Sequence, residues 1–145
     1  MIESVEVYKC VLVRESTVEY EATGCDAVLD VAKAIGMLDA AEEYMYLLCL
    51  DSRLQIIGIH QISHGGISVA MVPASSVMKR VILNNSEKFI LVHNHPSGVV
   101  SPSPADRAST QNMAQAAKLL GLQLLDHVIV GFPGNYYSFE KEGLL

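Results

Sequence analysis

Residues 89–106 read FILVHNHPSGVVSPSPAD, and this stretch indicates the end of a buried strand, a turn and the start of a helix. The apolar run at 89–92 has the composition of a buried strand, and the Pro-Ser-Gly at 96–98 ends it. Ser-Pro at 103–104 is a typical helix start, because proline is favoured at the first helical position. The stretch therefore predicts a strand that turns into a helix lying against it.

Three polar side chains in this stretch are placed to meet. His93 and His95 are two residues apart on the predicted strand, so they share a face, and the helix would carry Asp106 back towards them. Two imidazole nitrogens and one carboxylate oxygen suit zinc, and three protein ligands leave one tetrahedral position open for water. An open position is typical of catalytic zinc, so the spacing H-x-H-x7-S-x2-D predicts a hydrolytic zinc site.

The same residues also have simpler interpretations. Ser103 and Asp106 form a helix-capping pattern and could have no further role. Two histidines at a strand end are often just polar residues where a sheet meets solvent. The conjunction of strand, histidine pair, turn and acidic helix start favours the metal site.

Hydrolysis also needs a general base, and no carboxylate within residues 93–106 is free for that role. Glu42 and Glu43 directly precede the strongly apolar run at 44–50. Glu43 is the first choice because it shares a strand face with Met45, and Glu42 is its close rival. The simpler interpretation of either residue is a solvated acid flanking a strand.

The segment from His93 to Asp106 resembles the JAMM motif of MPN-domain metallopeptidases, and its His-Asn-His-Pro-Ser-Gly sequence is the form found in bacterial RadC-like proteins. Over roughly the last two-thirds of the chain, further short motifs occur in the same order as in RadC-like proteins. Its further landmarks are Leu50-Asp51, Gly65 or Gly66, Val72-Pro73, Thr110, residues 125–131 and Ser138-Phe139. The resemblance implies a cytidine-deaminase-like fold with zinc bound by His93, His95 and Asp106. It also implies that Glu43 is the general base and that Ser103 stabilises the tetrahedral oxyanion.

The chain departs from that family in two places. Ala74-Ser75 follows Pro73 where RadC-like proteins commonly have Arg-Glu, which removes a competing base and favours Glu43. The first forty residues do not resemble a helix-hairpin-helix segment and instead indicate a strand at 5–13 and a helix at 26–38. This departure argues against a DNA-repair role.

Alternating elements predict an α/β fold in which residues 1–145 form one domain, with a mixed sheet flanked by helices. We expect strands at 44–50, 54–62, 68–72, 89–93, 122–130 and 136–139, and helices at 74–84 and 104–120. Asp51-Ser52-Arg53 reads as a hairpin turn, and Gly121 as a helix C-cap.

Composition indicates a compact cytoplasmic enzyme. Half of the 145 residues are hydrophobic, which suffices for one core. Three cysteines without C-x-x-C spacing argue against disulfides and a cysteine-zinc site, and neither a membrane span nor a signal peptide is evident. The net charge is −6 and the ten Lys and Arg form no stripe, which argues against nucleic acid as a partner.

Several other polar residues receive structural interpretations. Asp126 and His127 would point to opposite faces of a strand, one buried and the other outward. His60 and His64, near Gly65-Gly66, are expected to face solvent. Asn94 would face away from the two histidines and bond to backbone groups.

Three functions compete. The first is a zinc hydrolase that cuts an amide bond in a peptide or protein substrate, and the complete set of ligands, base and oxyanion donor favours it. The second is a non-catalytic binding or scaffold module on an MPN fold. The third is nucleic-acid processing, as RadC-associated repair or as a nuclease, which the acidic balance disfavours. A zinc deaminase is disfavoured, because this sequence lacks the H-x-E and P-C-x-x-C motifs of those enzymes.

Overall fold

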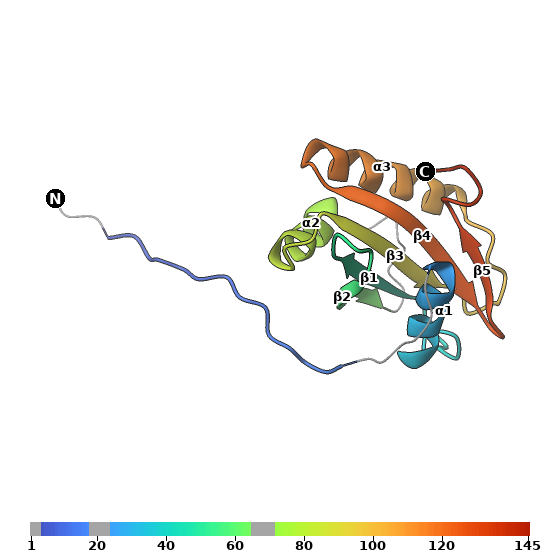
Figure 1. Cartoon of the computed structure of the whole chain (residues 1–145). Helices are drawn as coiled ribbons and strands as arrows, with labels where there is room; N and C mark the ends of the chain where they lie inside the picture. Colours follow the sequence, from blue (N-terminus) through green and yellow to red (C-terminus); the bar gives the residue numbers. More distant parts are fainter. Residues whose placement is uncertain (1–3, 18–23, 65–71) are drawn as a thin grey trace.

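The computed structural model describes residues 4–17, 24–64 and 72–145 as a five-stranded sheet with three helices (Figure 1). In chain order the elements are α1 (Gly24–Ala34), β1 (Tyr44–Leu50), β2 (Ile56–His64), α2 (Ala74–Leu83), β3 (Lys88–Asn94), α3 (Pro104–Leu119), β4 (Gln123–Gly131) and β5 (Asn135–Ser138). Across the sheet the order is β2-β1-β3-β4-β5, with β3 and β4 parallel and every other neighbouring pair antiparallel. The predicted fold class, an α/β unit with a mixed sheet, is confirmed.

Helices cover both faces of this sheet, α2 and α3 on one and α1 on the other (Figure 1). The core under α2 and α3 contains Met45, Leu47 and Cys49 of β1, Phe89 and Leu91 of β3, Val77, Met78 and Val81 of α2, and Met113 and Ala117 of α3. The core under α1 contains Leu48, Val92, Val128 and Val130 of the sheet with Val28, Val31 and Ala32 of the helix. β1 and β3 are therefore buried on both faces, which explains their continuous apolar runs.

The predicted turn between β1 and β2 is confirmed. The Asp51 carboxylate accepts hydrogen bonds from the backbone N–H groups of Arg53 and Gln55, both at 2.9 Å. Leu54 completes the turn with a φ of 63°. An aspartate side chain that bonds to backbone groups two and four residues on stabilises such a reversal.

Most predicted elements lie within a few residues of the observed ones, and two differ. The expected strand at 5–13 is wrong, because residues 4–17 form neither helix nor strand and six of their large hydrophobic side chains are exposed. α1 ends at Ala34 and not at 38, because Gly36 adopts a φ of 81° and the Met37 N–H bonds back to the Ala32 carbonyl. The expected strand at 68–72 falls almost entirely outside the described residues.

The end of β3 is the place where the polar site can form. Phe89, Leu91 and His93 share the strand face that α3 covers, so the core on that face ends at His93. None of the helices in the described part of the chain is long and apolar enough to cross a membrane.

Candidate metal and catalytic site

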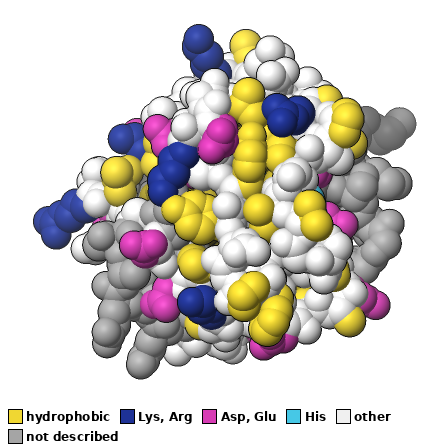
Figure 2. Space-filling view, turned by 90° about the vertical axis from the view of Figure 1, so that its right-hand side faces the viewer, with side chains coloured by type: hydrophobic (Ala, Val, Ile, Leu, Met, Phe, Trp, Pro, Cys, Tyr) yellow, Lys and Arg dark blue, Asp and Glu magenta, His cyan; other side chains and the backbone are white. Residues whose placement is uncertain are grey.

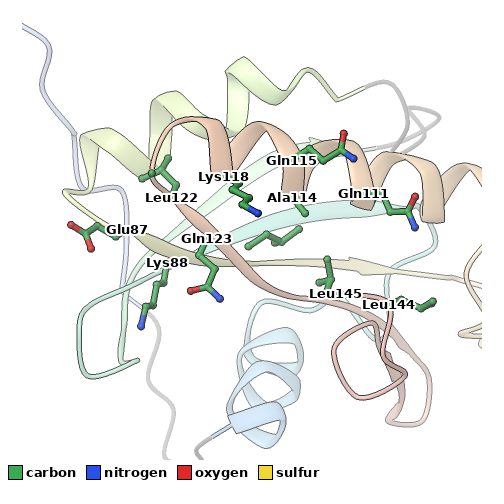
Figure 3. Close-up of a pocket in the computed structure, with 12 residues that line it drawn as sticks. Glu87, Lys88, Gln111, Ala114, Gln115, Lys118, Leu122, Gln123, Leu144 and Leu145 are labelled. Carbon is green, nitrogen blue, oxygen red and sulfur yellow. The ribbon is translucent and has the colours of Figure 1, made fainter.

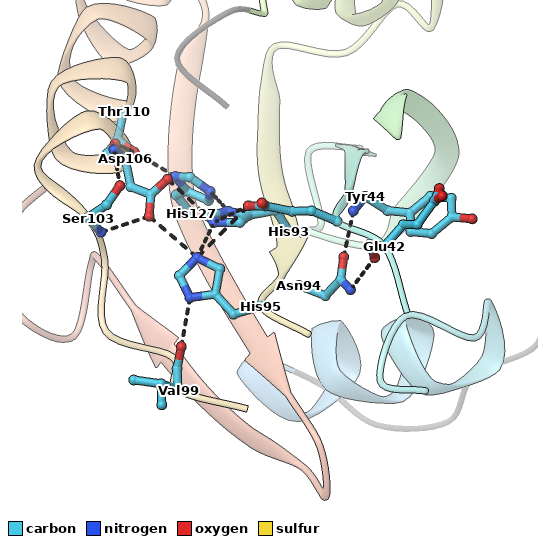
Figure 4. Close-up of polar contacts among 11 residues, drawn as sticks. Glu42, Tyr44, His93, Asn94, His95, Val99, Ser103, Asp106, Thr110 and His127 are labelled. Atoms are coloured by element: carbon cyan, nitrogen blue, oxygen red, sulfur yellow. Dashed lines mark hydrogen bonds and ion pairs between the residues drawn. The ribbon is translucent and has the colours of Figure 1, made fainter. Parts of the chain in front are cut away.

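His93 and His95 meet at the end of β3, as the strand alternation predicted. Their Nε2 atoms are 3.0 Å apart (Figure 4). The His93 side chain is fully buried, whereas that of His95 is 18% exposed. One imidazole therefore lies within the fold and the other lines the opening to solvent.

Asp106 lies in the first turn of α3 and faces both histidines. Its Oδ1 is 3.6 Å from Nε2 of His93, and its Oδ2 is 3.5 Å from Nε2 of His95. The carboxylate also accepts a hydrogen bond at 2.8 Å from the backbone N–H of Ser103. Burial would raise the pKa of Asp106, but the hydrogen bonds with His93, His95 and the Ser103 backbone outweigh it and lower that pKa. The carboxylate is thus held as an anion beside the two rings.

Ser103 caps α3, as its simpler interpretation predicted. Its Oγ accepts the backbone N–H of Asp106 at 3.0 Å, which completes a reciprocal capping box. That bond uses a lone pair of the hydroxyl and leaves its hydrogen able to donate. Capping and a second role for Ser103 are therefore compatible.

Glu43, in the segment that leads into β1, brings a second carboxylate to the histidines. Its Oε1 is 3.7 Å from Nε2 of His93 and 4.0 Å from Nε2 of His95. The β1–β3 register pairs Met45 with His93, and continuing it by two residues brings Glu43 opposite His95. Glu42 instead turns its backbone carbonyl towards Asn94. The structure thus brings the carboxylate of Glu43 to the histidines.

His127 of β4 also contacts the site, although it was not among the predicted site residues. Asp126 and His127 were expected to have one buried and one outward side chain, but both are buried, at 7% and 0% exposure. The expectation fails because β4 is covered on both faces. Asp126 accepts hydrogen bonds from the Ser138 hydroxyl and the Glu140 N–H, while His127 bonds to His93.

A chain of hydrogen bonds determines which nitrogens carry protons. The single hydroxyl hydrogen of Thr110 donates to the carbonyl of Asp106 at 2.7 Å, so its oxygen accepts from Nδ1–H of His127 at 2.6 Å. Complete burial lowers the pKa of His127 well below its usual value, so its ring is neutral and its Nε2 is an acceptor. Nδ1 of His93 therefore donates to it at 2.6 Å, which in a neutral ring makes Nε2, the nitrogen that faces the site, an acceptor.

The loop after His95 holds its ring as His127 holds that of His93, with Nδ1 as the donor and Nε2 facing the site. Nδ1 of His95 donates to the carbonyl of Val99 at 2.7 Å. Hydrogen bonding to Asp106 raises the pKa of His95, against the effect of burial. The short contact between the two Nε2 atoms needs a positive centre between them, which is either a proton on His95 or a cation.

The spacing of the converging atoms fits a small tetrahedral cation. Ligand atoms 2.0–2.1 Å from a tetrahedral zinc lie roughly 3.3 Å from one another. The two Nε2 atoms are 3.0 Å apart, and each has a different oxygen of Asp106 nearby, Oδ1 at 3.6 Å from His93 and Oδ2 at 3.5 Å from His95. Glu43 and the two histidines also present ligand atoms that lie within 4.8 Å of one another. This site can hold a metal ion, with Asp106 closer to both histidines than Glu43 is.

Neither His127 nor Thr110 was predicted as a site residue, although weak signals exist for both. Thr110 lies one helical turn after Asp106 and so faces the same side of α3. Asp126 and His127 interrupt an otherwise apolar strand, which marks polar groups that need buried partners. Neither signal identifies the partner.

Other residues follow or depart from expectation. Asn94 faces away from the histidines and bonds to backbone groups, as predicted. His60 was expected to face solvent but is partly buried and bonds to Asn84, and burial lowers its pKa. The side chain of His64 and the Gly65-Gly66 pair lie outside the described residues.

A groove of about 840 Å³ lies at the opposite end of β3 and β4 (Figure 3). Leu122, Leu124, Leu144, Leu145, Gln111 and Lys118 contribute to its lining. None of the residues lining it belongs to the histidine cluster. The groove lining contains no histidine or cysteine, so we place the candidate site at the histidines and not in the groove.

Comparison with known proteins gives a consistent match. Residues 23–144 match the RadC-like JAB domain family. A UPF0758 protein of Porphyromonas gingivalis is 40% identical over 109 residues, covering 75% of this chain and 48% of that protein. One from Coxiella burnetii is 43% identical over 103 residues, covering 71% and 46%. One from Thermotoga maritima is 38% identical over 109 residues, covering 75% and 49%. The chain spans about half the length of these curated relatives, whose names state no activity.

Proposed function

This chain belongs to the RadC-like JAB domain family, and we propose that it is a zinc-dependent hydrolase of the JAMM type that cleaves an amide bond in a peptide or protein. The observation that carries the proposal is the convergence of two imidazole nitrogens and two carboxylates on one point. Once both imidazoles are neutral, these groups are all acceptors towards the site, which favours a bound cation between them.

In this proposal His93, His95 and Asp106 hold the zinc. The donor set of two nitrogens and one oxygen favours zinc over the harder magnesium and calcium ions, which prefer oxygen ligands. Zinc bound there would lower the pKa of a water ligand to about 7 and polarise the carbonyl of a substrate. The hydrogen bonds from His93 to His127 and from His95 to Val99 hold the two rings in the required tautomers.

Glu43 is proposed as the general base. Its carboxylate lies slightly farther from both histidines than Asp106 does, and 36% of its side chain is exposed. It can therefore meet a water molecule at the open side of the site, take its proton and deliver that proton to the leaving nitrogen. Ser103 is proposed to donate its free hydroxyl hydrogen to the oxyanion of the tetrahedral intermediate.

Partners and compartment are part of the same proposal. A peptide or protein substrate fits an amide hydrolase, whereas the net charge of −6 disfavours a phosphate backbone. On the face shown in Figure 2, Lys and Arg side chains are scattered among Asp and Glu and form no continuous basic surface. Cys10 and Cys49 are free thiols, in keeping with the reducing cytoplasm.

Metal analysis and one substitution test the proposal. Purified protein supplied with zinc should hold about one ion per chain, and His93→Ala or Asp106→Ala should lose most of it. Peptides, isopeptide-linked conjugates and small acyl-amides are then screened with the zinc-loaded protein.

The Glu43→Gln variant separates catalysis from metal binding. It should keep zinc while turnover of any cleaved substrate falls by roughly 10² to 10⁴. Glu42→Gln is the matched control and should retain turnover. Full zinc occupancy in both ligand variants would refute the metal site. Unchanged turnover in Glu43→Gln would refute the base.

A further inference from the structure

Asn94 lies between the two histidines in sequence, but its side chain points to the other face of β3 (Figure 4). It is only 1% exposed. Its Oδ1 accepts a hydrogen bond from the backbone N–H of Tyr44 at 2.6 Å, and its Nδ2 donates to the backbone carbonyl of Glu42 at 2.9 Å. If the Asn94 amide were flipped, its NH2 group would face the Tyr44 N–H and its oxygen would face the Glu42 carbonyl, so these two partners determine its orientation. One side chain thus binds both peptide groups that flank Glu43.

The side chain of Asn94 replaces a missing rung of the sheet. The paired register of β1 and β3 ends where Met45 lies opposite His93. Just beyond, the backbone N–H of His95 donates to the Val130 carbonyl of β4 at 2.9 Å. The backbone of β3 thus stays paired with β4 beyond the point where its paired register with β1 ends, and the Asn94 amide connects β3 to the segment that carries Glu43.

We infer that Asn94 is a positioning residue that holds Glu43 at its working distance from the histidines, an inference that rests on the proposed role of Glu43 as the base. The Glu43 side chain is partly exposed, and its Oε1 lies 3.7 Å from Nε2 of His93 and 4.0 Å from Nε2 of His95. Its direction thus depends on where its backbone is held. A displacement of about 1 Å at a catalytic group can reduce turnover by roughly 10²-fold.

Ser86 supplies a matched control. It is 4% exposed, and its hydroxyl accepts from the backbone N–H of Leu50 at 3.1 Å and lies 2.6 and 2.7 Å from the carbonyls of Leu50 and Lys88. It therefore connects β1 to the start of β3 by the same kind of bonds, at the opposite end of both strands. Ser86→Ala should weaken the fold to a similar degree without moving Glu43.

Crystal structures of the zinc-loaded wild type, Asn94→Ala and Ser86→Ala test the inference directly. We expect the Glu43 carboxylate to shift by about 1 Å or more in Asn94→Ala alone, with His93 and His95 in place, a displacement of the size that affects catalysis. Asn94→Asp keeps the bond from the Tyr44 N–H but cannot donate to Glu42, so it serves if the alanine variant does not fold. A Glu43 carboxylate that keeps its wild-type position in the variant overturns the inference.

Kinetics give a second, independent readout. Turnover of Asn94→Ala should fall roughly 10- to 100-fold with little change in KM and full zinc content. In a Glu43→Gln background the same substitution should have almost no further effect, because the two residues act through one group. An equal loss in Ser86→Ala, or additive losses in the double variant, would contradict positioning. If the zinc-loaded wild type cleaves none of the substrates, the proposed function fails while the crystal structures still decide the role of Asn94.

Discussion

Replacing Thr110 with valine tests whether the buried hydrogen-bond chain prepares the proposed zinc site. Thr110 is 1% exposed, and its oxygen accepts from Nδ1–H of His127 at 2.6 Å and donates to the Asp106 carbonyl at 2.7 Å. Valine has nearly the same shape, so the substitution removes the hydroxyl without opening a large cavity. The experiment therefore isolates the hydrogen bonds from packing.

The expected magnitude follows from which groups lose a partner. The Asp106 carbonyl can still accept the helical N–H bond of α3, so its loss is small. Nδ1–H of His127 is fully buried and loses its only acceptor in the described structure, which costs about 1–3 kcal/mol of unfolding free energy. The His127 proton can also move to Nε2, which would turn His93 into an acceptor there and put a proton on the nitrogen that faces the metal. Zinc affinity should then fall by roughly 10- to 100-fold.

Two measurements check this prediction. Urea denaturation of the metal-free protein gives the change in unfolding free energy, and competition with a chromophoric chelator gives the zinc affinity. Thr110→Ser is the control because it keeps the hydroxyl, so it should keep wild-type zinc affinity. Wild-type affinity in Thr110→Val would show that Thr110 does not set the protonation of His127 and His93, and would refute the reasoning.

Three further predictions concern protonation, the oxyanion and nucleic acid. Zinc must displace the proton from His95, whose pKa is raised by Asp106, so zinc affinity should rise with pH and level off above that pKa. Calorimetry in buffers of different ionisation enthalpy should detect the released proton at lower pH. A zinc affinity that does not depend on pH would contradict this prediction. Ser103→Ala should lower turnover by roughly 10² to 10³ and the unfolding free energy by about 1 kcal/mol, whereas a stability loss alone would leave only capping. Titration with duplex and single-stranded DNA should give binding weaker than about 100 μM at physiological salt, and tight binding with a steep salt dependence would support nucleic-acid processing instead.

The elements that sequence patterns predicted well are those whose signal is local. The apolar run of β1 was predicted to its observed bounds. A strand buried on both faces is apolar at every position, so its ends lie where the polar residues begin. Pro104 marks the start of α3 by removing a backbone donor that a helix leaves unbonded in any case. A strand was also expected at 5–13, yet no strand forms there, because a strand also requires a neighbour to accept its hydrogen bonds.

The sequence by itself determined the part of the site that lies on one short stretch of chain. His93 and His95 share a face because side chains alternate along any strand, and Asp106 returns to them because the turn and helix are encoded between them. The choice of Glu43 over Glu42 could be ranked but not decided from position. The pairing of β1 with β3 brings Oε1 of Glu43 within 4.0 Å of both Nε2 atoms, and its role as the base stays a proposal.

Only the tertiary structure decided how the site is supported. His127 contacts His93 across 34 residues of sequence, and it is buried because Thr110 of α3 and the ring of Phe139 pack against it. Thr110 and Asn94 likewise act through partners on other elements. Hydrogen-bond partners in a folded core are chosen by proximity and by the cost of leaving a buried polar group unpaired, and neither quantity exists along the sequence before the strands and helices have packed.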